Sequence, residues 1–298
     1  MRILVIGKDG QLAKCLKDVS KKFSFEIYFN SKAQLDITDL SHLEESILKS
    51  KPEVIINCSA YTAVDKAEQY KQDAFAVNSV GVKELAKVCN ENSIYLIHIS
   101  TDYVFDGTGE EYYKESRTPN PSTIYGQSKL SGEEEIKKSN CKYLIIRTAW
   151  LFSEHGKNFF NTMIMLAKER NSLKIISDQF GCPTYGPDLA FAIFSAVPYI
   201  MKGEKIGLYH FGGSKSCSWD KFAEEIFKEA YRKKVIKKIP VIERVNSNEF
   251  VTLAKRPKNS RLDSSLFYST FNIEPSNWKK GIKKSVEGIS KSSISANR

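Results

Sequence analysis

The first half of the chain alternates between short apolar segments and longer amphipathic ones. Runs rich in Val, Ile, Leu, Tyr and Phe, typical of buried strands, lie at 2–6, 25–29, 53–60, 94–100 and 142–148. Segments with helical character lie between them, at about 11–21, 38–50, 67–91 and around Tyr125–Lys129. Strands that alternate with helices pair in parallel, and right-handed crossovers place helices on both faces of the sheet. The alternation therefore predicts a doubly wound α/β fold, with Thr38 or Asp39 capping the second helix.

A glycine-containing turn joins the first strand to the first helix. It reads G-K-D-G-Q-L-A, so Gly7, Gly10 and Ala13 follow the pattern G-x-x-G-x-x-A. Glycines in such a turn let the backbone approach a pyrophosphate closely, and the helix N-terminus attracts its negative charge. In a strand–helix–strand unit this turn predicts a dinucleotide site.

The end of the second strand indicates which dinucleotide binds. An acidic side chain there would hold the adenosine ribose hydroxyls and repel a 2′-phosphate. Asn30, Ser31 and Lys32 supply no acid, which favours NADPH and still permits NADH. Lys32 is equally well a surface residue. Asp36 either bonds the adenine amino group or serves as a turn or capping residue.

Polar residues gather where the fourth strand ends, in I-S-T-D-Y-V-F-D-G at 99–107. Ligands of doubly wound folds bind at the carboxyl ends of the strands, which makes Thr101 a candidate to hydrogen-bond a substrate carbonyl. The stretch Ser100–Asp102 is also compatible with an ordinary polar exit from a strand.

Tyr125 and Lys129 stand four residues apart on the next helix, which places them on one face. The ordinary interpretation is a half-buried ring beside a solvated charge. The chemical interpretation is proton transfer. A free tyrosine has a pKa of about 10, and a nearby cation stabilises its phenolate. We expect Lys129 to lower the pKa of Tyr125, and Thr101 to steady a carbonyl oxygen as charge develops on it.

The second half of the chain is less regular. Helices are expected near 156–170, 187–201 and 218–233, and strands near 173–176, 207–211 and 239–242. We divide the chain into a Rossmann-type, NADP(H)-binding domain at 1–150 and a smaller, mainly substrate-binding α/β lobe at 151–298. Segments near 156–170 and 187–211 are free to return to the first domain. The tail after Trp278 is rich in Lys and Ser, and we expect its last residues to be disordered.

Six scattered cysteines argue against a disulfide or zinc framework. No C-x-x-C pair occurs, and four of the six fall in or beside predicted helices and strands: Cys15, Cys58, Cys89 and Cys141. Free thiols are typical of the cytoplasm. The start M-R-I-L-V-I-G meets a glycine too early for a signal peptide, and the longest apolar stretch, at 189–201, is too short to span a bilayer. We expect a cytoplasmic protein without a membrane partner.

The net charge of +10 is unevenly spread. Residues 1–150 carry 20 Lys/Arg and 21 Asp/Glu, whereas residues 151–298 carry 25 and 14. Nucleic acid binding is one interpretation of a basic half, but its lysines are dispersed and form no DNA-binding motif. A lobe that attracts a phosphorylated small molecule explains the charge equally well, and a solvated surface accounts for most of the lysines. We expect no nucleic acid partner.

Together these motifs resemble the extended short-chain dehydrogenase/reductases, and more narrowly the dTDP-4-dehydrorhamnose reductase family. The matching stretches run from residue 4 to about 263: G-K-D-G-Q-L, C-S-A-Y-T-A-V-D-K-A-E, I-S-T-D-Y-V-F-D-G, Y-G-Q-S-K-L-S-G-E, R-T-A-W-L-F, D-Q-F-G-C-P-T and K-R-P-K-N-S-R-L-D. Y-x-x-x-K is shared by the whole superfamily, whereas S-T-D-Y-V-F, D-Q-x-x-x-P-T and R-P-x-N-S are specific to this family and its close relatives. The resemblance implies NADPH-dependent reduction of the C4 keto group of dTDP-4-dehydro-L-rhamnose to dTDP-L-rhamnose, a precursor of cell-surface polysaccharide.

The resemblance also implies roles for individual residues. The catalytic set would be Thr101, Tyr125 and Lys129. The cofactor would be held by Tyr125 and Lys129 and by a second group of residues: Gly7, Gly10, Gln11, Leu12, Asp36, Ile37, Ala60, Tyr61 and Thr62. The sugar nucleotide would meet Thr101, Asp102, Trp150 and Arg256, and the segments 179–184 and 256–260 would belong to the substrate lobe.

Two positions depart from the family pattern, and several alternatives stay open. Tyr61 stands where the family often has histidine, and Ala13 where it often has glycine. Some members bind Mg²⁺ at an acidic subunit contact, but the sequence locates no such site, and a homodimer is compatible with it. Other readings are a reductase for another 4-keto-6-deoxy nucleotide sugar, or a non-catalytic NADP-binding regulatory subunit resembling that of methionine adenosyltransferase.

Overall fold

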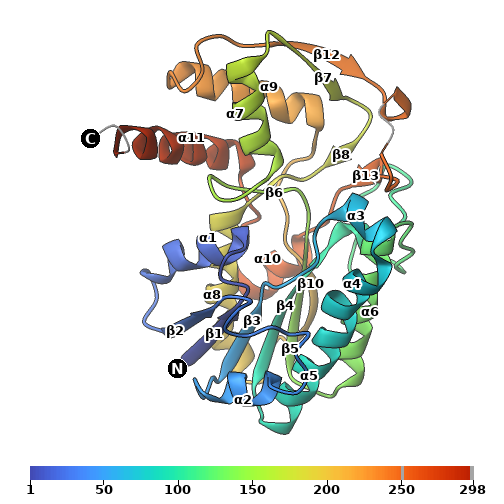
Figure 1. The fold of residues 1–298 in the computed structure, drawn as a ribbon, viewed down its shortest axis with the longest axis vertical. Helices are drawn as coiled ribbons and strands as arrows, with labels where there is room; N and C mark the ends of the chain where they lie inside the picture. The colour runs from blue at the N-terminus through green and yellow to red at the C-terminus, as the bar shows by residue number, and fades with distance from the viewer. Residues whose placement is uncertain (250–251, 296–298) are drawn as a thin grey trace.

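The protein is described by a computed structural model covering residues 1–249 and 252–295. Figure 1 shows a central sheet flanked by helices, with a second group of helices and short strands beyond the carboxyl ends of the sheet strands. The α/β, doubly wound fold predicted from the sequence is confirmed.

The central sheet is six-stranded and parallel, in the order β10-β5-β4-β3-β1-β2. Its strands are β1 (Arg2–Ile6), β2 (Glu26–Asn30), β3 (Val54–Asn57), β4 (Tyr95–Thr101), β5 (Tyr143–Thr148) and β10 (Gly207–His210). The chain reverses direction across the sheet between β1 and β3, because β2 lies on one side of β1 and β3 on the other. Such a switch point opens a crevice at the carboxyl ends of the strands, where ligands bind.

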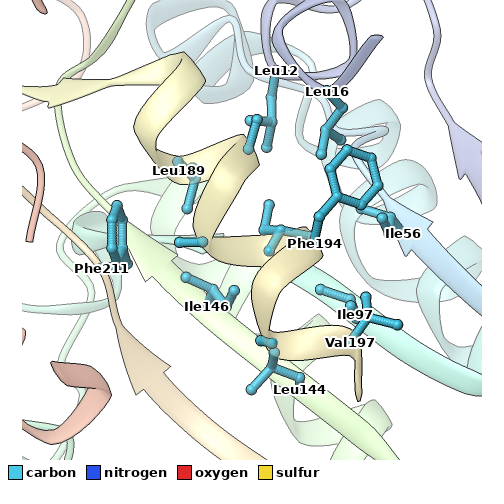
Figure 2. Packing of buried hydrophobic residues seen from close by; sticks show 14 of the residues in the cluster. Leu12, Leu16, Ile56, Ile97, Leu144, Ile146, Leu189, Phe194, Val197 and Phe211 are labelled. Carbon is cyan, nitrogen blue, oxygen red and sulfur yellow. The ribbon is translucent and has the colours of Figure 1, made fainter. Parts of the chain in front are cut away.

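Both faces of the sheet are buried, which explains the continuous apolar runs of its strands. One face packs against α1 (Gln11–Ser20), α8 (Gly186–Met201) and α10 (Ser265–Phe271), and Figure 2 shows this layer around Phe194 and Ile146. The other face packs against α2 (Leu43–Leu48), α5 (Gly81–Glu91) and α6 (Ile124–Lys138). The sheet therefore provides a rigid platform for the residues at its carboxyl edge.

A second cluster of elements forms its own apolar core. It contains α7 (Phe159–Glu169), α9 (Trp219–Arg232), α11 (Trp278–Ser295) and the parallel pair of β7 (Ser172–Ile176) and β12 (Val241–Val245). Short strands link it to the sheet domain: β6 (Leu151–Phe152), β8 (Phe180–Gly181), β9 (Thr184–Tyr185), β11 (Cys217–Ser218) and β13 (Asn259–Ser260). In the sheet domain, α8 packs on α1 and β10 pairs with β5. The division at residue 150 stays a prediction.

The predicted helix at 38–50 is wrong in its first turn. Helix α2 begins only at Leu43, so neither Thr38 nor Asp39 caps it. Both residues are used in turns instead: the Thr38 backbone N–H and hydroxyl donate to Asp36, and the Ser41 hydroxyl donates to Asp39. Short polar side chains that bond their own backbone compete with helix formation, and here they delay it.

The predicted long helix at 67–91 is divided. The structure has α3 (Val64–Gln69), α4 (Lys71–Phe75), a π-helical turn at Ala76–Val80 and then α5. The widened turn carries Asn78, whose side-chain amide donates to the Tyr61 carbonyl and to the Ser128 hydroxyl. Turns of this kind occur at functional sites because they reorient one side chain without ending the helix.

The lysine-rich tail forms helix α11 as far as Ser295, and the predicted disorder of the last residues falls on 296–298, outside the described residues. In residues 1–249 and 252–295, no helix is both long enough and apolar enough to cross a membrane.

Candidate active site

A cavity of about 680 Å³ lies at the carboxyl ends of the sheet strands, between the sheet and the second cluster of elements. An adjoining cavity of about 320 Å³ continues past the first glycine turn. The larger cavity is lined by most of the predicted site residues: Gly10, Gln11, Leu12, Ala60, Thr62, Thr101, Asp102, Tyr125, Lys129, Trp150 and Arg256. The smaller one is lined by Gly7, Asp36, Ile37 and Tyr61, with Gly10 and Ala60 shared. The fold thus brings the whole predicted set together, although the role of each residue stays a prediction.

The turn after β1 is shaped for a phosphate group. Gly7 has φ 89°, and a Cβ there would lie 2.9 Å from the Ser59 backbone nitrogen, so only glycine fits. Helix α1 begins at Gln11, and the residues at its N-terminus line the cavity, where the first turn of a helix has free backbone N–H groups. The buried side-chain nitrogen of Gln11 has no hydrogen-bond partner. These features fit the pyrophosphate of a dinucleotide.

The far end of the smaller cavity carries Lys32 and Asp36. Asp36 accepts two hydrogen bonds from Thr38. It therefore has the turn role that the sequence left open beside a bond to the adenine amino group. The Lys32 ammonium lies 3.4 Å from the Asp36 carboxylate, and its side chain is 79% exposed. An exposed cation at this end, with no acid on Asn30 or Ser31, suits the 2′-phosphate of NADPH.

Tyr125, Thr101 and Lys129 all line the larger cavity. Tyr125 and Lys129 come from the start of α6, and Thr101 is the last residue of β4. All three side chains are buried. Burial raises the pKa of Tyr125 above its usual value, partly offset by a hydrogen bond with the Thr101 hydroxyl. The Lys129 ammonium nitrogen lies 2.8 Å from the Ile99 carbonyl and 3.0 Å from His98 Nε2.

The expected effect of Lys129 on Tyr125 is not what the structure shows. Lys129 was expected to lower the pKa of Tyr125, but burial dominates and raises it. The physical reason is desolvation, which disfavours the phenolate, while the Lys129 nitrogen bonds to β4. A phenol with a raised pKa stays protonated at neutral pH, which is the form a proton donor needs.

Asp102 and Arg256 border the same cavity. Asp102 is 5% exposed; one carboxylate oxygen accepts a hydrogen bond from the Thr101 hydroxyl and the other has no partner. The Arg256 guanidinium donates to Asp65 at 2.8 Å and to the Tyr103 hydroxyl at 3.3 Å. Asp102 therefore offers a free acceptor to a ligand hydroxyl, whereas the charge of Arg256 is already partly paired.

We expect replacement of Asp102 by asparagine to stabilise the protein above about pH 6. Burial raises the pKa of Asp102 from 3.8 to about 6, so the unfolded carboxyl ionises first and stability falls as the pH rises through this window. A shift of this size corresponds to about 3 kcal/mol, which sets an upper limit on the gain. Thermal unfolding midpoints at about pH 4 and pH 7.5 test this, with a gain expected only at the higher pH.

Asp106→Asn is a control for which the expected change in stability has the opposite sign. A hydrogen bond from the Thr108 backbone holds the pKa of Asp106 below its usual value, so its ionised form favours the folded protein. This variant should lose stability at neutral pH. Equal gains for both variants, or a gain for Asp102→Asn that does not depend on pH, would contradict the assignment of an ionised, unpartnered Asp102.

Stacked aromatic rings form the wall of the larger cavity on the side of the second cluster of elements. Trp150 and Trp219 are parallel, with ring centroids 3.4 Å apart, and Phe159 and Phe222 pack around them. Trp150 has φ 49°, a conformation rare for a bulky residue, so the surrounding contacts must hold it. Trp150 was predicted from the sequence as a site residue. Trp219 and Phe159 were not, because only their aromatic residue type gave a signal.

Gly181→Ala is expected to raise the KM for a substrate bound against Trp150 at least about tenfold and to leave the affinity for a dinucleotide unchanged. A Cβ on Gly181 would lie 2.3 Å from the Trp150 ring, and Trp219 blocks the ring from moving away. Steady-state kinetics and NADPH fluorescence titration measure the two quantities. Gly212→Ala is the matched control, because Gly212 lies outside the left-handed region and a Cβ there would meet its nearest atoms at ordinary contact distances of 3.6–3.8 Å. An unchanged KM would show that Trp150 does not contact the substrate.

One cluster among the described residues brings three metal-ligating atoms within 4.8 Å of one another, from Asp18, Glu154 and His155. His155 Nε2 already bonds Asp18 at 2.6 Å, and Glu154 accepts a bond from Ser285. The arrangement is satisfied as an ordinary ion pair, so it is a poor fit to the Mg²⁺ site that the family resemblance left open, and no step depends on it.

Comparison with known families is consistent with this geometry. Residues 1–290 match the family described as RmlD substrate binding domain. The chain belongs to the RmlD family. The dTDP-4-dehydrorhamnose reductase of Aggregatibacter actinomycetemcomitans is 40% identical over 285 residues, which cover 95% of this chain and 97% of that protein. The reductase of the same name from Escherichia coli K12 is 35% identical over 294 residues, or 97% and 98% of the two chains.

Solved structures of the RmlD family share the whole architecture. The crystal structure of dTDP-4-dehydrorhamnose reductase from Bacillus anthracis in complex with NADP superposes with a TM-score of 0.88 at 35% identity, covering 95% of this chain and 98% of that one. The resemblance drawn from the motifs is thereby confirmed over nearly the full length of the chain.

Proposed function

We propose that this RmlD-family chain catalyses the NADPH-dependent reduction of the C4 keto group of dTDP-4-dehydro-L-rhamnose, giving dTDP-L-rhamnose. The observation that carries the proposal is the meeting of Thr101, Tyr125 and Lys129 inside the cavity that the glycine turn borders. Relatives at 35–40% identity bear the name of this reductase, and one related crystal structure contains NADP.

Each residue of the site would have a separate role in the reaction. The α1 N-terminus and Gln11 would hold the pyrophosphate of the cofactor, which supplies a hydride when bound. Tyr125 would donate its proton to the carbonyl oxygen of the substrate, and its raised pKa keeps that proton available. Thr101, which lines the same cavity, would steady the oxygen as it becomes an alcohol.

The substrate would occupy the side of the cavity nearer to the second cluster of elements. The stacked pair of Trp150 and Trp219 offers an apolar wall for a sugar or base, and Asp102 offers an acceptor for a hydroxyl. Arg256 and the basic second half of the chain favour a diphosphate, whose negative charge they attract.

The test is an NADPH oxidation assay with enzymatically prepared dTDP-4-dehydro-L-rhamnose, followed by the absorbance of the reduced nicotinamide. NMR of the product identifies the sugar and its configuration at C4. Formation of dTDP-L-rhamnose would support the proposal. NADPH binding without oxidation would instead point to another 4-keto-6-deoxy sugar or to the non-catalytic regulatory subunit, and a pull-down would then seek a synthetase partner.

We also propose a cytoplasmic location. All six cysteines are free thiols, as expected in a reducing compartment. Cell fractionation tests this, and sedimentation of the purified protein tests the homodimer that the sequence leaves open.

A further inference from the structure

A buried chain of three side chains runs beneath the candidate catalytic centre. Asn57 and His98 are direct neighbours in the β3–β4 ladder, and the Asn57 amide nitrogen lies 3.2 Å from His98 Nδ1. On the other side of the ring, His98 Nε2 lies 3.0 Å from the Lys129 nitrogen. Each of the three side chains is at most 1% exposed, so water does not replace these contacts. The proposed reduction uses neither Asn57 nor His98.

The orientation of the Asn57 amide is fixed from its other side. The Asn57 side-chain oxygen accepts from the Ser59 backbone N–H at 3.0 Å and from the Ser59 hydroxyl at 2.5 Å. A backbone N–H can only donate, so the oxygen of the amide must face Ser59 and its NH₂ group must face His98.

This orientation selects one form of the imidazole. An amide NH₂ group only donates, so His98 Nδ1 must be the acceptor and carry no proton. Burial lowers the pKa of His98 well below its usual value, which keeps the ring neutral. A neutral ring carries one proton. Because Nδ1 carries none, that proton lies on Nε2 and is directed at the Lys129 nitrogen. A neutral amine accepts that proton in a hydrogen bond, whereas an ammonium would place N–H against N–H.

We propose that Asn57 and His98 set the protonation state of Lys129: the Asn57 amide selects the Nε2–H form of His98, and this form stabilises the neutral amine of Lys129 over its ammonium. His98 and Asn57 are positioning residues, because they act through Lys129. Protonation of Lys129 then requires either loss of the His98 hydrogen bond or loss of the Asn57 hydrogen bond. The tautomer itself is independent of the proposed reduction; only its effect on catalysis rests on that function.

The other groups around Lys129 do not cancel this effect. The titratable side chains that face it come from β4, from the residue after β3 and from its own helix: His98, Cys58, Tyr125 and Glu133. Burial keeps Cys58 and Tyr125 uncharged. Glu133 favours the ammonium, but its carboxylate is shared with Arg147 in two hydrogen bonds. Burial accordingly lowers the pKa of Lys129 to about 8 despite Glu133.

The consequence for catalysis is an alkaline limit, by which we mean the pH above which kcat/KM for NADPH falls. If the ammonium of Lys129 is the form that holds a bound cofactor, kcat/KM for NADPH falls as the pH rises through the pKa of Lys129. Selecting the other form of His98 should move this limit upward, because Nε2 would then accept a hydrogen bond from the ammonium.

The experiment begins with the tautomer. Long-range ¹H–¹⁵N spectra distinguish Nε2–H from Nδ1–H in the four histidines of the full-length protein, and the His98→Gln variant assigns the signal. At about pH 9, above the pKa of Lys129, we expect His98 in the Nε2–H form. An Nδ1–H form at this pH would overturn the proposal, whether or not the protein is a reductase.

Two variants of Asn57 then test the coupling. In Asn57→Asp the carboxylate accepts from both Ser59 and His98, so the ring should switch to Nδ1–H and the alkaline limit should rise by at least about one pH unit. Asn57→Leu removes the donor without adding charge and should shift the alkaline limit in the same direction. A shift in this variant would be due to the change of tautomer and not to an added negative charge. A limit that stays in place in both folded variants would overturn the coupling.

His210→Gln is the matched control. It removes another fully buried imidazole that faces a cation, Arg147, on the far side of β5. This variant should lower the melting temperature without moving the alkaline limit. Absence of NADPH oxidation in the wild type would count against the proposed function alone, because the NMR result stands without it.

Discussion

Tyr125→Phe is expected to lower kcat by about 10²–10⁴-fold, the usual contribution of a general acid. The substitution removes the hydroxyl proton that Tyr125 would donate to a substrate oxygen in the cavity that Thr101 also lines. The ring itself stays, and its edge-on packing against Tyr103 at 5.4 Å is unaffected. NADPH oxidation with the keto-sugar measures kcat, and fluorescence titration measures cofactor affinity, which should change by less than about threefold.

Tyr209→Phe is the matched control for this loss. Tyr209 is also a buried tyrosine, but it lies on β10 against Phe267 and Phe271, away from the cavity. Its variant should retain turnover. A Tyr125→Phe protein that keeps most of its activity would show that another group supplies the proton, and the mechanism would then be wrong.

Glu133→Gln is expected to destabilise the protein by about 3–5 kcal/mol, the usual cost of leaving a buried charge without its partner. Glu133 on α6 and Arg147 on β5 are 0% and 1% exposed, and the pair is held by two hydrogen bonds of 2.6 and 2.8 Å. The Ser100 hydroxyl also donates to Glu133. Removing the negative charge therefore leaves the Arg147 guanidinium buried and unbalanced. Urea denaturation of the apo-protein measures the change.

Two further variants make this prediction specific. Glu135→Gln, two residues further along α6, breaks only a partly exposed pair with Lys138 and should change stability by less than about 1 kcal/mol. The double variant Glu133→Leu/Arg147→Met replaces both charges by apolar side chains and should recover much of the loss. A single variant as stable as the wild type would mean that the pair does not hold α6 on the sheet.

The agreement between sequence and structure follows the strength of the local signal. The strands of the first half fall within a few residues of their predicted bounds, because a strand buried on both faces must be apolar along its length. The start of helix α2 and the interruption of the segment at 64–91 were mispredicted, because hydrogen bonds of single side chains determine both. Asn78 illustrates this: its hydrogen bonds go to Tyr61 and Ser128, residues that no local pattern connects to it.

The same division holds at the site. The glycine turn, Thr101 and the Tyr125–Lys129 spacing could be found from the sequence, since each depends on a strand end or on one helical turn. Trp219 and His98 could not. Trp219 reaches the cavity only because α9 packs its first turn on Trp150, and His98 matters only because β4 lies under α6.

The sequence by itself determined the parallel sheet, the dinucleotide turn and the family of this protein, because these depend on periodicity and short motifs that are local in the chain. Only the tertiary structure decided the charge states at the site. The raised pKa of Tyr125 and the lowered pKa of Lys129 arise from burial beneath elements distant in the sequence. Desolvation depends on how completely the folded chain excludes water around a group, and no local pattern specifies that.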